Sequence, residues 1–455
     1  MTKPTFLVIL ILVCALPLTG QVPYGSIELT SKNLKTLQRF LVGDTVVLFY
    51  SDPYSSRQPQ PYLNEHWVFI TTAGERQNLR IPELVGKEKV AVLRNGENLL
   101  FYFAEEVKKQ TLLKVLTYNT QTKEKTISQC CVIPDNLIVT ALDETLTFIY
   151  STPAGELGLM QIDAGRVVRD ARYPVPPNTI HVKSGVAFID EGAFIHPGQA
   201  FQPVKIYRSQ DQIVITHDKI DYNFNNKKSV TYWTIIDTNS GNVTSMTIPE
   251  PGRTLYKSIW HDGKLYRIIK DKGFHIRIFD GEEEVDSFSI PYDVGYADSS
   301  GMLRDDAARR VFNNRNVRDV MDNLGKPFIV VQKIDATNII LKVGTQREVS
   351  HGHTPILPMA SIPGLFVSLA VSSISHAIAD ESYIHHYFYL KGNISDGFTY
   401  TNETSLLEQR IDQYELFDPK TKLDYRYKSY LRTNHHTIAF YMRGRSRRLE
   451  LVGFR

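Results

Sequence analysis

Three histidines in the C-terminal third of the chain are candidates for metal chemistry. His351 and His353 flank Gly352, and on an extended strand their side chains would share one face, where His376 could join them. Imidazole nitrogens bind zinc or copper when three or four of them converge. These spacings match no established metal motif, so the sequence favours separately packed histidines. No bound cofactor is predicted, and these three remain the residues to test for a metal.

Neighbouring carboxylates are the candidates for hydrolytic chemistry. Asp380 and Glu381 follow a mainly apolar stretch, residues 357–379. Glycoside cleavage uses two carboxyl groups about 5–10 Å apart around the sugar. The sequence contains no serine-nucleophile elbow, no H-E-x-x-H motif and no phosphate-binding loop. Asp380 and Glu381 are therefore the catalytic candidates, and the sequence does not establish that they reach one site.

Cys130 and Cys131 are adjacent, which raises the question of a disulfide between them. Such a bond closes an eight-membered ring and requires a distorted backbone. The surrounding residues Thr126, Ile127 and Val132 predict a strand, on which consecutive side chains point to opposite faces. The sequence therefore favours two free thiols, with the Cys130–Cys131 disulfide as the alternative.

Most of the chain predicts short strands, because β-branched and aromatic runs alternate with Gly, Asp and Asn turns. One unit recurs: a strand, a polar turn and a second strand, often ended by a proline that cannot donate to a sheet. Six stretches predict such hairpins: residues 69–82, 116–134, 160–176, 234–249, 276–291 and 414–427. A further strand pair precedes several of them, which makes units of four strands.

Four-stranded units repeated along a chain are typical of a β-propeller, whose blades span roughly 40–50 residues. The prolines that end five of the hairpins lie 42 to 73 residues apart. We predict an all-β fold of about seven blades, with six or eight possible, closed by residues 437–442 and 447–454 beside residues 26–30. The alternative is two β-sandwich domains.

One insertion is predicted at about residues 298–326. Residues 305–323 have the best helical pattern after the N-terminal segment, with a mixed apolar stripe. We expect this helix to lie across one face of the disc. Residues 21–455 otherwise form one predicted domain.

Residues 1–20 predict a signal peptide, because Lys3 precedes an apolar run of 11 residues that ends before Pro17. That run is too short to span a membrane, which takes about 20 residues. A lipid anchor on Cys14 is the weaker alternative, since Val13 is not the small residue that lipoprotein signals require. We expect an extracytoplasmic protein, secreted or periplasmic, with no transmembrane segment in the mature chain.

The composition excludes two broad classes of protein. Hydrophobic residues make up 42% of the 455 residues, which is ordinary for a globular chain and too many for a disordered one. The net charge of +3 is too small to suggest nucleic-acid binding. The sequence therefore predicts a binding or assembly module for a protein or glycan partner. The alternative is a secreted hydrolase or lyase that uses the carboxylates and histidines above.

Overall fold

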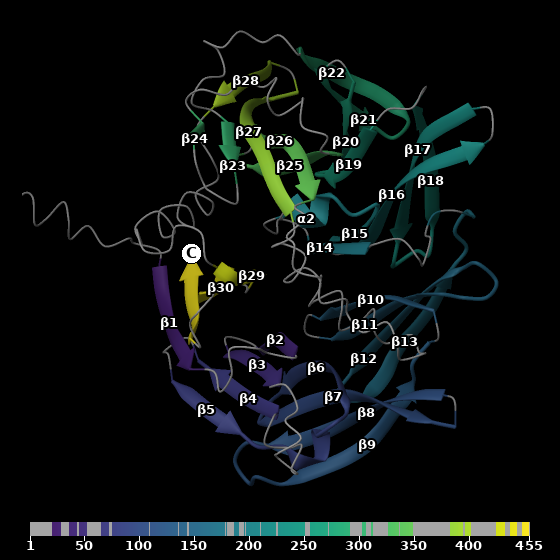
Figure 1. The fold of residues 1–455 in the computed structure, drawn as a ribbon. Helices are drawn as coiled ribbons and strands as arrows, with labels where there is room; N and C mark the ends of the chain where they lie inside the picture. The colour runs from purple at the N-terminus through teal and green to yellow at the C-terminus, as the bar shows by residue number, and fades with distance from the viewer. Residues whose placement is uncertain are drawn as a thin grey trace, which may run out of the picture.

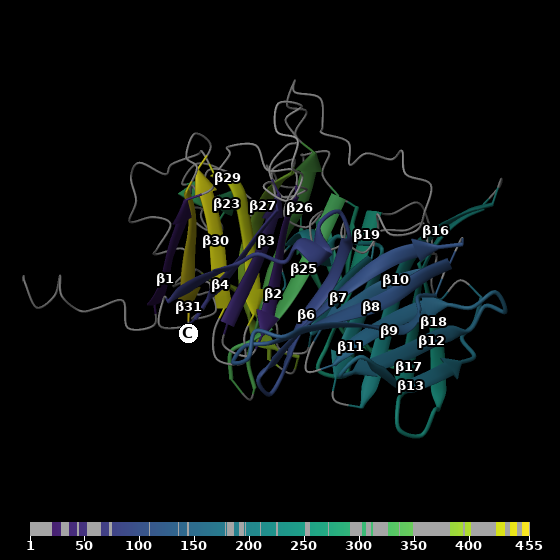
Figure 2. The same ribbon diagram turned by 90° about the horizontal axis from the view of Figure 1, so that it is seen from below.

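In a computed structural model of the chain, the described residues form a β-propeller of seven sheets. The structure describes residues 21–28, 36–42, 45–51, 65–71, 75–108, 110–134, 136–142, 145–177, 179, 186–190, 195, 197–209, 211–223, 226–250, 255–271, 273–291, 303–305, 311–312, 326–335, 337–348, 383–394, 396–401, 425–432, 437–443 and 448–454. The sheets follow one another around a ring in chain order (Figure 1). Turned by 90°, they lie side by side in one layer (Figure 2).

The first three blades each have four antiparallel strands in sequence order. Blade one contains β2 (Thr36–Val42), β3 (Thr45–Ser51), β4 (Glu65–Ile70) and β5 (Arg76–Leu79). After the 3-10 turn η2 (Pro82–Leu84), blade two contains β6 (Glu88–Asn95), β7 (Asn98–Val107), β8 (Gln110–Asn119) and β9 (Lys125–Val132). Blade three contains β10 (Leu137–Leu142), β11 (Leu146–Ser151), β12 (Leu157–Asp163) and β13 (Arg166–Tyr173).

Blades four and five carry most of the site described below. Blade four has five strands, because β14 (Val186–Asp190) lies parallel to the strand that follows it. The other four are β15 (Val204–Ser209), β16 (Gln212–Asn223), β17 (Asn226–Asp237) and β18 (Val243–Glu250). The short helix α2 (Pro197–Ala200) connects β14 to β15. Blade five contains β19 (Leu255–His261), β20 (Lys264–Lys270), β21 (Gly273–Asp280) and β22 (Glu283–Pro291).

The last two blades complete the ring. Blade six contains β25 (Lys326–Lys333), β26 (Ile339–Glu348), β27 (Tyr383–Asn393) and β28 (Gly397–Thr401), with β23 (Leu303–Asp305) and β24 (Val311–Phe312) added beside β27. Blade seven joins β29 (Tyr425–Arg432), β30 (Thr437–Arg443) and β31 (Arg448–Phe454) to β1 (Gln21–Glu28). The strand at the start of the described chain thus closes the ring with those at its end.

The hydrophobic core lies between neighbouring blades. Ile27 of β1 packs with Val46 of β3 and Phe440 of β30, so one cluster joins blade seven to blade one. Other clusters join blades one and two, two and three, and three and four, and the largest spans blades four to six. Strands such as β3 and β11 are almost continuously buried, whereas the last strands β5 and β9 are mostly exposed. This gradient explains why the inner strands read as apolar runs.

Five of the six predicted hairpins are confirmed. They are β4–β5, β8–β9, β12–β13, β17–β18 and β21–β22. The predicted closure is also confirmed, because β31 pairs with both β30 and β1. The sixth hairpin falls at residues 414–427, of which only 425–427 are described, and these begin the first strand of blade seven. Two β-sandwiches are not favoured, since the sheets form one ring.

The predicted helix is wrong wherever its residues are described. Leu303–Asp305 and Val311–Phe312 form strands that pair with each other, and Arg304 and Asp305 also pair with Tyr387 and His386 of β27. The free edge of β27 offers main-chain partners to these residues, and this tertiary pairing overrides a weak helical pattern. Residues 306–310 and 313–325 lie outside the described part, as does the predicted signal peptide at 1–20. No helix among the described residues is long and apolar enough to cross a membrane.

Candidate functional site

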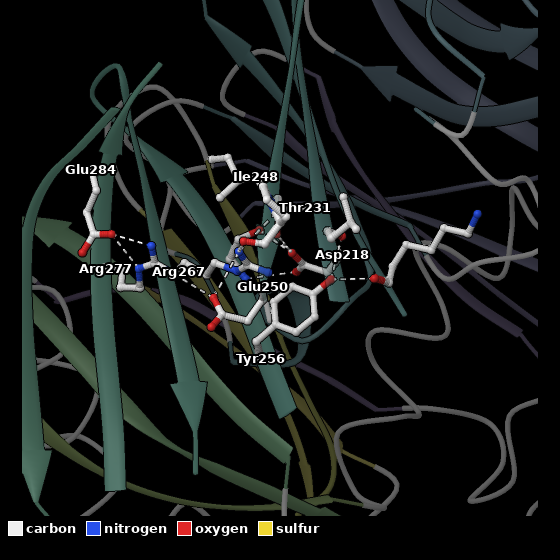
Figure 3. Close-up of polar contacts among 12 residues, drawn as sticks. Asp218, Thr231, Ile248, Glu250, Tyr256, Arg267, Arg277 and Glu284 are labelled. Carbon is white, nitrogen blue, oxygen red and sulfur yellow. Dashed lines mark hydrogen bonds and ion pairs between the residues drawn. The ribbon is translucent and has the colours of Figure 1, made fainter. Parts of the chain in front are cut away.

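Asp218 is a buried carboxylate at the centre of a polar network between blades four and five (Figure 3). Its side chain accepts hydrogen bonds from Lys205 Nζ at 3.1 Å and Thr231 Oγ1 at 3.0 Å, both in its own blade. From β19 of the next blade, Ser258 donates its backbone N–H at 3.0 Å and its hydroxyl at 2.7 Å. Asp218 therefore links three strands of blade four to blade five.

The charges around Asp218 hold it ionised. Burial by itself raises the pKa of Asp218, but Lys205, Lys257 and the two Ser258 hydrogen bonds outweigh burial and bring that pKa down to about 2. Burial lowers the pKa of the Lys205 ammonium, and Asp218 counteracts this. Because each group is the other's charge partner, the two form one buried ion pair.

The network continues outward along the face of blade five. Ser258, Arg267 and Arg277 are direct cross-strand neighbours on β19, β20 and β21, so their side chains form one row facing blade four. Arg277 donates to Glu250 Oε2 at 2.9 Å and, through Nε, to Glu284 Oε2 at 2.8 Å. The outer end of the row is thus neutralised by carboxylates.

Arg267 is fully buried in the middle of this row. Its Nη1 donates to the carbonyl of Ile248 at 3.2 Å and lies 3.5 Å from Glu250 Oε2. Its Nε and Nη2 are buried and find no partner in the described chain. The guanidinium carbon lies 4.3 Å from the centre of the Tyr256 ring, and this cation–π contact offsets part of the cost of burial.

The inner end of the network has an excess of positive charge. Lys257 on β19 and Lys326 on β25 place their Nζ atoms 5.0 Å and 5.5 Å from the centre of the Phe201 ring. Phe201 directly follows α2, which lies at the inner ends of blades four to six (Figure 1). Neither ammonium forms an ion pair within the described residues, and Asp218, the partner of Lys205, is the carboxylate that acts on Lys257.

The pKa of Lys257 lies well below the ordinary value for lysine. Burial lowers its pKa most, and the charges of Lys205 and Lys326 lower it further, whereas Asp218 raises it, with the result near 7. Lys326 is exposed, Lys257 is partly buried and Lys205 is fully buried. The cluster therefore runs from the surface to the interior, and an anion that approached Lys326 and Lys257 would relieve their mutual repulsion. We call Lys205, Lys257 and Lys326 with Phe201 the inner lysine cluster.

The site residues chosen from the sequence lie elsewhere. Asp380, Glu381, His351, His353 and His376 all fall outside the described residues, so the catalytic and metal hypotheses stay predictions. Within the described part, no group of three or more His, Cys, Asp or Glu side chains is placed to hold a metal ion.

Sequence reasoning missed the inner lysine cluster. The one signal that could have marked its lysines is their position in the sequence. Lys326 begins an apolar strand, and Lys205 and Lys257 interrupt two others. A charged residue inside such a run is rarely buried without a partner. Their convergence from three blades could not be read from the sequence, because no local pattern relates them.

The comparisons with known proteins concern the fold. No protein-family model matches the chain, and no curated protein matches it. Among solved structures, the β-propeller domain of the Trilobed protease from Pyrococcus furiosus aligns with 69% of this chain and 92% of its own, at 10% identity and a TM-score of 0.25. The WD40 domain of SCAP from fission yeast aligns with 92% of this chain and 82% of its own, at 9% identity and a TM-score of 0.29.

A prolyl endopeptidase is also similar, at 7% identity and a TM-score of 0.33. The alignment covers 95% of this chain but only 48% of the endopeptidase, so this chain spans about half the length of that protein. Similarities this low imply nothing about activity. The propeller assignment follows from the ring of seven sheets.

Proposed function

We propose that this protein is an extracytoplasmic β-propeller that acts as a binding or assembly module for a protein or glycan partner. The partner places an anionic group, such as a carboxylate, against Lys257 and Lys326. The observation that carries this proposal is the pair of ammonium groups around Phe201, neither of them in an ion pair with the described chain. A partly buried cation with no counter-ion costs stability, which an anionic partner would restore.

The location of the cluster supports the same proposal. Phe201, Lys257 and Lys326 come from three consecutive blades and meet where their inner strands approach each other. Propellers present ligand sites where several blades converge, and flanking side chains from rigid strands lose little entropy on binding. The Phe201 ring adds an apolar surface between the two charges.

The extracytoplasmic part of the proposal rests on the first twenty residues. β1 begins at Gln21, directly after the predicted cleavage position, and pairs with β31 from its first residue. Cleavage after Gly20 would therefore leave intact every strand among the residues that the structure describes. N-terminal sequencing of the exported protein tests this directly, and a mature chain that still begins at Met1 would contradict it.

The binding test uses the purified protein with two panels of probes, acidic peptides and acidic glycans. We expect one panel to bind the wild type and to lose at least about tenfold in affinity with Lys257→Met and Lys326→Met combined. Lys264→Met is the matched control, because this lysine lies on the same blade but pairs with Asp280 at 2.9 Å. Equal binding by the wild type and the double variant, or no binding to either panel, would overturn the proposal.

The second hypothesis, a hydrolase or lyase, rests on Asp380, Glu381, His351 and His353. Those residues lie outside the described part of the structure. A broad hydrolase screen followed by alanine substitution at these positions is its test.

A further inference from the structure

Cys130 and Cys131 lie on the outermost strand of blade two, at an irregularity in its pairing. Leu113 of β8 pairs with Cys131 and Lys114 pairs with Gln129, so Cys130 has no partner of its own on β8. Two residues of β9 therefore oppose one residue of β8, which defines a β-bulge. A bulge bends the strand and re-aims the side chains on either side of it.

The bulge brings both thiols to the same side of the sheet. Cys130 and Cys131 are partly buried and pack against one hydrophobic cluster, formed between blades two and three. The next residue, Val132, is 45% exposed. Because both side chains pack against the same cluster, the two thiols lie on one side of the strand and each affects the titration of the other. The expectation that adjacent side chains diverge holds only for a regular strand, and this strand is irregular at these two residues.

The interaction between the two thiols lowers the pKa of Cys130 and raises the pKa of Cys131, and burial raises both. The first ionisation of the pair is therefore eased and the second is opposed, so a single thiolate forms while the other sulfur keeps its proton. In the structure both are free thiols.

We infer that Cys130 and Cys131 form a redox site, in which a small-molecule disulfide such as oxidised glutathione converts the dithiol reversibly into a disulfide between the two neighbours. The inference is independent of the inner lysine cluster, which lies between other blades.

The reaction proceeds by two thiol–disulfide exchanges. The Cys130 thiolate attacks one sulfur of oxidised glutathione, whose S–S bond breaks, and the first glutathione leaves and takes up the proton that Cys130 lost. The Cys131 sulfur then attacks the Cys130 sulfur, and the second glutathione leaves with the proton from Cys131. The protein loses two protons and two electrons, and oxidised glutathione gains them. Because the bulge places both thiols against the same cluster, the second step is fast compared with that of a regular strand, whose adjacent side chains diverge.

The test uses the full chain with Cys14→Ser, which leaves only these two thiols, treated with oxidised glutathione and analysed as an intact mass. We expect a loss of two hydrogens with no persistent glutathione adduct, reversed by dithiothreitol. Cys131→Ser should instead retain one glutathione on Cys130, because the resolving thiol is missing.

A matched control moves the pair to the regular part of the same strand. Thr126→Cys and Ile127→Cys, combined with Cys130→Ser and Cys131→Ser, place adjacent cysteines where the register with Thr117 and Leu116 is undisturbed. We expect this variant to accumulate glutathione adducts. If the wild-type pair accumulates adducts to the same extent, or both pairs close equally well, the bulge does not make a redox site and the inference fails. Circular dichroism of each variant checks that it is folded.

Discussion

Two neighbouring lysines of the site are in opposite electrostatic situations. Lys205 is fully buried but paired with Asp218, whereas Lys257 is partly buried, contacts Phe201 and forms no ion pair with the described residues. Removing one partner of a buried pair leaves an uncompensated charge, but removing an unpaired charge relieves the fold. The two lysines should therefore respond to substitution with opposite signs.

Lys257→Met should stabilise the protein at neutral pH. In the folded state the pKa of Lys257 is near 7, below its ordinary 10.5, so between these values the unfolded chain binds more protons. The free energy of unfolding of the wild type should therefore increase as the pH rises from about 7 to 10.5, and decrease again as the pH falls over the same range. The variant should lack this pH dependence and be more stable below pH 7 by on the order of 2 kcal/mol. Urea unfolding at several pH values measures this difference in free energy of unfolding. The prediction is refuted if the free energy of unfolding depends on pH in the same way in both proteins.

Asp218→Asn should be strongly destabilising, by about 3–5 kcal/mol, because it leaves the Lys205 ammonium buried without a counter-ion. Adding Lys205→Met should recover part of that loss. A double-mutant cycle by chemical denaturation gives the coupling between the two, and strictly additive effects would mean that they do not act as a pair.

Single strands of the propeller are held by close packing across the sheet. Gly158 of β12 pairs directly with Tyr150 of β11, whose ring lies over the glycine and whose hydroxyl donates to Asp170 of β13 at 2.8 Å. A Cβ at position 158 would collide with that ring. The absence of a side chain here therefore lets one tyrosine bridge three strands.

Gly158→Ala should cost about 1–3 kcal/mol, because Tyr150 must leave its position over β12. Tyr150→Phe is the control, since it keeps the ring and removes only the hydroxyl that donates to Asp170, and it should cost less. Thermal unfolding of the two variants separates crowding from hydrogen bonding. A smaller loss for Gly158→Ala than for Tyr150→Phe would show that the ring moves aside without cost.

The whole molecule depends on closure of the ring by β1. This strand pairs with β31 over its full length, and Ile27 is buried between blades seven and one. An open ring would leave the edge of β31 and this cluster exposed, and closure is how a propeller limits such edges.

Ile27→Ala should destabilise the whole protein by about 2–5 kcal/mol, as expected for a buried isoleucine. Glu28 is the next residue on the same strand and is exposed, so Glu28→Ala should have little effect. Denaturant unfolding followed by tryptophan fluorescence measures both, because Trp67 lies in blade one and Trp233 and Trp260 lie in blades four and five. Loss of the Trp67 signal alone would show that closure is a local and not a global feature.

The hairpins and the closure of the ring could be predicted because they depend on local chemistry. Asp237 accepts hydrogen bonds from the N–H groups of Asn239 and Ser240, and Gly241 adopts a positive φ of 77°, so the β17–β18 turn is encoded in a few consecutive residues. The apolar inner strands, and the outer strands that end near a proline, are likewise encoded by consecutive residues. The sequence alone therefore determined the fold class and the approximate number of blades.

The groupings of functional side chains were decided by tertiary structure. The packing of three blades brings Lys205, Lys257 and Lys326 together, and the burial that lowers the pKa values of Lys205 and Lys257 comes from that packing. The bulge at Cys130 arises from the pairing register between β9 and β8. The residue pattern of β9 alone does not show that register. Residues 303–305 and 311–312 became strands because β27 offered them an edge. In each case the deciding energy comes from contacts between segments distant in the chain, whereas the hairpins draw theirs from neighbours.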